Sequence, residues 1–254
     1  MASASPPNLK SGISPPLKIV FLGHSICRDL NSFMITEMPN FNFDTSEVQC
    51  EFLAYGGMKI PGIYSQLKHL IKFQPQIVIL LVGSCDVTAK SVPSVLVNDL
   101  LEVSRFLFKE IESINKLVFS KLLPRHPGGK YYFNTYNDIA HETNRLLLSQ
   151  VKGIDNVSLF QMDLPFPCEN LTRYNNSFSS CFKRDGVHLN STGLFRLSRG
   201  YRSVILGIKK NQLSCWKCHC RYAWVNLFFL VWLIWLILYQ IITSAKFSKM
   251  IICF

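Results

Sequence analysis

Two loops near opposite ends of the chain hold the residue types of a nucleophile and its base. Ser25 follows Gly23-His24 after a short apolar run, and Asp185-Gly186-Val187-His188 lies far along the chain. An aspartate and a histidine three residues apart in a loop can face the same way, so that the carboxylate orients the imidazole. The second ring nitrogen is then free to take a proton from a serine hydroxyl. At the N-terminus of a helix, backbone N–H groups favour the negative charge that develops in such a reaction.

Two further loops carry glycines and small residues. Gly56-Gly57 allows a ligand to approach the backbone without a Cβ in the way, and Gly83-Ser84-Cys85-Asp86 follows another apolar run. Each piece alone has an ordinary explanation, because a Gly-Gly pair is usually a turn and an Asp-x-x-His is more often a cap or a salt bridge. The order of all four along one strand–helix pattern is far more specific.

Short apolar runs alternate with helical patterns between residues 17 and 210. The runs expected as strands are Ile19–Leu22, Val48–Tyr55, Ile77–Val82, Leu117–Leu122 and Val157–Phe160. Helical spacing appears over 60–71, 92–114, 136–151 and 197–208. The alternation predicts a single three-layer α/β/α domain with a mostly parallel sheet, whose chemistry lies in the loops after the carboxyl ends of the strands.

The four motifs resemble the four spaced blocks of the SGNH hydrolases, also called GDSL esterases and lipases. The likeness covers roughly residues 17–210 and is carried by Gly23-His24-Ser25-Ile26, Gly56-Gly57, Gly83-Ser84-Cys85-Asp86 and Asp185-Gly186-Val187-His188-Leu189. Leu122-Leu123-Pro124-Arg125 and the segment 136–148 also resemble the branch of this family found in animal retroelement open reading frames.

The resemblance implies a flavodoxin-like domain that hydrolyses esters without a cofactor or a metal. It assigns Ser25 as the nucleophile, His188 as the base and Asp185 as the orienting acid. The oxyanion would be held by the backbone N–H groups of Ser25 and Gly57. The third donor in the family is an asparagine side chain, and Cys85 stands at that position. A thiol is a weaker donor than a carboxamide, and losing one oxyanion donor costs roughly 3–4 kcal/mol, so the likeness supports the fold better than the activity.

The composition fits a globular or membrane-attached protein. The 254 residues are 48% hydrophobic and 17% charged, which excludes wholesale disorder, collagen-like repeats and a coiled coil. The net charge is +11, but the last 44 residues hold four basic residues and no acid, which leaves +7 for residues 1–210. Residues 1–16 lack the apolar stretch of a secretory signal, so a flexible leader is expected there.

An apolar segment near the C-terminus has the length of a membrane span. Residues 222–242 contain no charge, and a helix of that length is roughly 31 Å long, which matches the hydrocarbon thickness of a bilayer. We expect a transmembrane helix over 222–243, followed by a short tail, 244–254. More basic residues precede the span than follow it, which favours a single-pass C-terminal anchor with the domain in the cytosol. Four Asn-x-Ser/Thr sequons point to the lumen instead; without a signal sequence we interpret them as chance or as turn-forming asparagines.

The expected linker between domain and span, 211–221, is rich in cysteine. It contains Cys215, Cys218, His219 and Cys220. These residues suggest zinc binding, although no second ligand pair lies at a suitable spacing. Juxtamembrane cysteines are also candidates for palmitoylation, which is favoured over zinc binding, and chance is the remaining explanation of the pattern.

Three functions therefore remain open. The Ser25, Asp185 and His188 pattern together with the apolar segment favours a membrane-tethered serine esterase acting on small acyl or lipid esters. Cys85 favours a non-catalytic binding module on the same fold. The basic balance suggests a nucleic-acid accessory protein, which is the least supported because no dense Lys/Arg run is present and the aromatic residues do not interleave with basic ones.

Overall fold

The computed structural model describes residues 15–125, 135–162 and 181–210. Five parallel strands form one sheet in the order β2-β1-β3-β4-β5. Their bounds are Leu17–Gly23 (β1), Val48–Ala54 (β2), Ile77–Leu81 (β3), Lys116–Ser120 (β4) and Val157–Phe160 (β5). This is the flavodoxin-like order, in which the sequence order of the strands reverses across the sheet between β1 and β3, and ligands bind at that switch point beyond the carboxyl ends of the strands. The predicted parallel α/β fold is confirmed.

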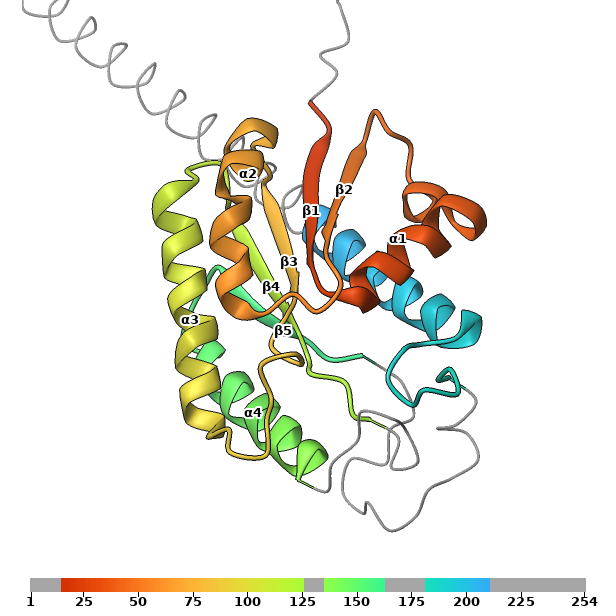
Figure 1. Cartoon of the computed structure of the whole chain (residues 1–254). Coiled ribbons are helices and arrows are strands. Elements are labelled where there is room, and N and C mark those ends of the chain that lie inside the picture. The colour runs from red at the N-terminus through yellow and green to blue at the C-terminus, as the bar shows by residue number, and fades with distance from the viewer. Residues whose placement is uncertain (1–14, 126–134, 163–180, 211–254) are drawn as a thin grey trace, which may run out of the picture. The chain divides into compact units, whose positions relative to one another are not determined.

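Helices cover both faces of the sheet (Figure 1). The helices α2, α3 and α4 lie on one face, and α1 and the helical residues 191–202 lie on the other. The bounds of the named helices are Ser25–Glu37 (α1), Leu67–Phe73 (α2), Pro93–Glu110 (α3) and Tyr136–Val151 (α4). The compact unit that holds the sheet ends at Arg202, and residues 203–210 continue the last helix.

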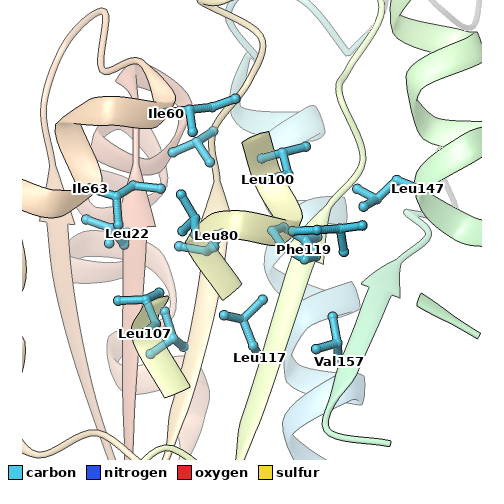
Figure 2. Close-up of a cluster of buried hydrophobic side chains, with 14 of the residues drawn as sticks. Leu22, Ile60, Ile63, Leu80, Leu100, Leu107, Leu117, Phe119, Leu147 and Val157 are labelled. Atoms are coloured by element: carbon cyan, nitrogen blue, oxygen red, sulfur yellow. The ribbon is translucent and has the colours of Figure 1, made fainter. Parts of the chain in front are cut away.

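The core is divided by the sheet because successive strand side chains point to opposite faces. Figure 2 shows Leu22, Leu80 and Phe119 from three strands packed with side chains of α3 and α4. On the opposite face Phe21 stacks on Phe52, with ring centroids 4.7 Å apart, and meets the edge of Tyr201 at 5.2 Å. The central strands are therefore buried on both sides, which explains the uninterrupted apolar runs Ile19–Leu22 and Ile77–Leu81.

One predicted helix differs from the structure. The helical spacing over 60–71 is divided between a 3₁₀ segment, Ile60–Gln66 (η2), and α2, each of seven residues. Pro61 and Gly62 stand at the start of this stretch, and both residues are poor formers of an α-helix interior. The apolar periodicity alone does not account for the low α-helix propensity of these two residues.

Several predictions concern residues outside the described part of the chain. The linker 211–221, the span 222–243, the tail 244–254 and most of the leader 1–16 all lie there. Among the described residues, no helix is long and apolar enough to cross a membrane.

Candidate active site

The first site residue, Ser25, begins α1 immediately after β1. Gly23 is required just before it, because a Cβ at that position would lie 2.4 Å from the carbonyl oxygen of Leu81 on β3. The close approach is fixed by a hydrogen bond from the His24 N–H to the same Leu81 oxygen, at 3.2 Å. Ser25 is half-buried, at the positive end of the helix, where backbone N–H groups stabilise negative charge.

Asp185 and His188 lie in a closed loop between residues 181 and 190. An antiparallel bridge joins Phe182 and Leu189, and the Lys183 N–H donates to the His188 carbonyl at 2.7 Å. The Lys183 ammonium also pairs with Asp29 on α1, Nζ to Oδ2 at 2.7 Å. These contacts hold the loop against the helix that begins with Ser25.

The three side chains form a continuous hydrogen-bonded relay. His188 Nδ1 lies 2.6 Å from Asp185 Oδ2, and His188 Nε2 lies 2.8 Å from Ser25 Oγ. Because an ionised carboxylate only accepts, Nδ1 carries the proton and donates it to Asp185. Nε2 is then the acceptor for the Ser25 hydroxyl, which is the arrangement of a general base beside a nucleophile.

Asp185 is held in the ionised form by its own loop. Burial opposes the charge, but its Oδ1 accepts from the backbone N–H groups of His188 and Val187, each at 2.9 Å, and its Oδ2 faces the imidazole. Together these bonds set the pKa of Asp185 below its ordinary value.

The lowered pKa of Asp185 has a consequence for stability. A carboxyl that is more acidic in the folded state stabilises the fold above its ordinary pKa, and this contribution is lost as the pH falls through the lower folded-state pKa. Urea denaturation of the wild type and Asp185→Asn, from neutral pH down to about pH 3, should show the difference in unfolding free energy shrinking as the pH falls. A difference that is independent of pH would contradict the charge-based account.

The predicted oxyanion glycine, Gly57, lies in the turn after β2. Its φ of +73° lies in the left-handed region that favours glycine, and no atom lies within 4 Å of where its Cβ would be. The Tyr55 N–H donates to the Gly23 carbonyl at 2.9 Å, and Gly23 pairs with Ala54 in the sheet. The turn is therefore held at the same sheet edge as Ser25, with its backbone open to a ligand.

The fifth predicted residue, Cys85, is half-buried in the loop after β3. Burial raises the pKa of the thiol, with a smaller opposing effect from Ser84 and Arg125, so the side chain is a neutral thiol at pH 7. Its neighbour Asp86 accepts from the Ile60 N–H through both oxygens, at 3.1 and 3.2 Å. Asp86 thus connects this loop to the segment that follows Gly57.

The structure adds three residues to this edge that the sequence motifs did not assign. His24 is buried behind Ser25, Ser84 bonds to it, and Arg125 reaches in from the loop after β4. Arg125 Nη2 donates to the Ser84 carbonyl at 2.9 Å, and its guanidinium lies 3.9 Å from the centre of the Tyr136 ring. The sequence signal that could have identified Arg125 is its position, because it follows a predicted strand and must lie at the same sheet edge.

A hollow at the same edge of the sheet is lined mainly by apolar side chains from the ends of the strands; its lining includes Ile26 and Val187, which flank relay residues, but not the relay side chains themselves. Its wall also includes polar groups of His24, Ser84 and Arg125. The apolar members include Leu81, Val82, Leu122, Phe160, Val187 and Leu197. Within the described ranges, no group of three His, Cys, Asp or Glu side chains is placed to hold a metal ion.

Comparison with known proteins bears on the fold. No family model matches the sequence, and no curated protein matches it. A GDSL-like lipase from Bacteroides thetaiotaomicron superposes with a TM-score of 0.56 at 16% identity, covering 76% of this chain and 89% of the lipase. The chain has the fold of GDSL-type hydrolases.

Two esterases show the same likeness. An acetyl-xylooligosaccharide esterase from Geobacillus gives a TM-score of 0.52 at 12% identity, covering 74% of this chain and 94% of the esterase. A psychrotrophic esterase from a Pseudoalteromonas species gives 0.51 at 12% identity, covering 76% and 99%. At this level of identity the likeness concerns the fold, and it confirms the predicted SGNH-type architecture.

Proposed function

We propose that this protein is a serine esterase that hydrolyses a carboxylic ester, acyl or acetyl, through Ser25, His188 and Asp185. The observation that carries the proposal is the relay itself, with Nδ1 to Oδ2 at 2.6 Å and Nε2 to Oγ at 2.8 Å. The lipase and esterase activities named for structures of the same fold support the reaction class.

The proposed reaction has two stages, formation of an acyl-enzyme and its hydrolysis. Ser25 Oγ attacks the ester carbonyl carbon while His188 Nε2 takes the hydroxyl proton, and Asp185 stabilises the imidazolium that forms. The backbone N–H groups of Ser25 and Gly57 bind the oxyanion. The intermediate collapses, the C–O bond to the alcohol breaks, and His188 gives its proton to the leaving oxygen. Water then attacks the acyl-enzyme by the same sequence and releases the acid.

The proposal includes a membrane tether. The charge-free segment 222–243 would serve as a single-pass C-terminal anchor, with the domain in the cytosol, and a small ester or a lipid would be the substrate. Neither a cofactor nor a metal takes part in the proposed steps.

Active-site labelling tests the proposal directly. The full chain, extracted in detergent from an alkali-washed membrane fraction, is incubated with a fluorophosphonate, which loses fluoride as the Ser25 Oγ–P bond forms. We expect stoichiometric labelling, mapped by mass spectrometry to the peptide containing Ser25, and none in Ser25→Ala or in heat-denatured protein.

Two outcomes of this experiment would count against the proposal. Absence of label in a protein whose circular dichroism shows an intact α/β fold would refute the esterase activity. Release of the full chain from the membrane fraction by the alkaline wash would refute the anchor alone.

A second function is supported by Cys85. A neutral thiol in place of the family's asparagine weakens the third oxyanion donor, as expected for a binding module that retains the fold without turnover. Substitution of this residue, described in the Discussion, separates the two functions.

A further inference from the structure

His24 is buried next to the nucleophile but takes no part in the proton relay. Only 6% of its surface is exposed, and it caps α1, with Nδ1 accepting from the Ile26 N–H at 3.3 Å. Its Nε2 lies 2.8 Å from Ser84 Oγ. Because Nδ1 accepts, the ring proton is on Nε2, which donates to the Ser84 hydroxyl. One imidazole thus connects the helix of Ser25 to the loop after β3.

Ser84 is fixed through both of its polar groups. The hydroxyl accepts from His24, and the carbonyl accepts from Arg125 Nη2 at 2.9 Å. On the other side of Cys85, the Asp86 carboxylate is bonded to the Ile60 N–H. Both sequence neighbours of residue 85 are therefore held in place by hydrogen bonds.

His24 stays neutral at neutral pH, which preserves Nδ1 as an acceptor and Nε2 as a donor. Burial is the main cause that lowers its pKa to about 4, and the positive charges of protonated His188 and of Arg125 act in the same direction. When His188 takes the Ser25 proton, the new positive charge further disfavours protonation of His24. Its donor and acceptor roles therefore persist through a catalytic cycle at neutral pH.

We propose that His24 is a positioning residue which, through Ser84, holds residue 85 at the third corner of the oxyanion site. This inference rests on the proposed esterase activity. The alternative role is that of a helix cap alone, which requires only the bond from the Ile26 N–H to Nδ1. The two roles depend on different nitrogens of the ring, so substitutions can separate them.

Two amide substitutions each replace one of the two ring nitrogens of His24. In His24→Asn the amide oxygen takes the place of Nδ1 and keeps the cap, but the side chain is too short to reach Ser84. In His24→Gln the amide N–H extends toward Ser84. Ser84→Ala removes the same bond from its other end and leaves the cap untouched. Ser104→Ala is the matched control, because it removes another buried hydroxyl, bonded to the Leu101 carbonyl at 2.7 Å on α3.

The measured quantities are kcat and KM for a short-chain aryl ester, with the full chain in detergent. Because the Cys85 thiol donates weakly, these variants are compared in the Cys85→Asn background, where residue 85 is a strong donor. There we expect His24→Asn and Ser84→Ala each to lower kcat by roughly 10- to 100-fold with KM changed less than about twofold, as for misplacement of a group that acts in the transition state. In the same background His24→Gln should recover most of kcat, and Ser104→Ala should leave it unchanged. The double variant that combines His24→Asn with Ser84→Ala should lose no more than either single one.

A coupling measurement distinguishes positioning from general stability. If His24 holds residue 85, the rate gain from Cys85→Asn should be at least about tenfold smaller in the His24→Asn background than in the wild type. An undiminished gain from Cys85→Asn in folded Ser84→Ala would overturn the inference even if His24→Asn fails to fold, and so would the absence of any gain from Cys85→Asn alone. An unlabelled and inactive wild type would instead refute the esterase proposal, so the two failures are distinguishable.

Discussion

Replacing His188 with alanine should lower kcat for ester hydrolysis by roughly 10⁴- to 10⁶-fold, with little change in KM. The reason is the geometry at Ser25, whose hydroxyl has an imidazole nitrogen 2.8 Å away as its proton acceptor. Without that nitrogen no base removes the proton of the Ser25 hydroxyl. A protonated hydroxyl is a weak nucleophile, because its pKa is far above neutrality. Because this nitrogen acts on the Ser25 proton rather than on substrate binding, the loss should fall on turnover.

The matched control is another histidine outside the site. His69 on α2 bonds to Glu51 on β2, Nε2 to Oε1 at 2.6 Å, and His69→Ala should leave kcat unchanged. The Ser25→Ala/His188→Ala double variant should be no slower than either single one, because the two residues act as a unit. Retention of more than about a tenth of kcat in His188→Ala, with its unfolding midpoint intact, would show that the relay is not the catalytic machinery.

The fold was predictable because its signals are local. The strand Val157–Phe160 and the helix Tyr136–Val151 have the bounds that their apolar patterns predict, since burial alone selects those periods. The 3₁₀ segment Ile60–Gln66 was not predicted, because periodicity records which residues are buried and omits the cost of Pro61 and Gly62.

Part of the site was predictable from local sequence, and part depends on tertiary contacts. Asp185 and His188 are three residues apart, so one loop suffices to bring them together, and the parallel sheet brings Ser25 to the same edge. The bonds among His24, Ser84 and Arg125 depend on the directions of side chains from three loops. No spacing rule fixes such directions, although strand ends indicate which loops share an edge.

Replacing Cys85 with asparagine should raise kcat by roughly 10²-fold, because one oxyanion donor is worth about 3 kcal/mol in serine hydrolases. The thiol at this position is neutral and a poor donor, whereas a carboxamide N–H donates well. The loop is already anchored through Ser84 and Asp86, so the new side chain would enter a held position and need little rearrangement.

Two variants at this position, compared with the wild type, make the measurement decisive. Steady-state hydrolysis of a short-chain aryl ester is compared for Cys85→Asn, Cys85→Ala and the wild type, with fluorophosphonate labelling rates as a second readout. Alanine has no donor and should not raise kcat, so a gain confined to asparagine would identify the missing hydrogen bond as the cause. Should asparagine bring no gain while the fold is intact, the oxyanion site lacks more than one donor. The binding-module function, in which the relay is retained without turnover, would then be the better account of this chain.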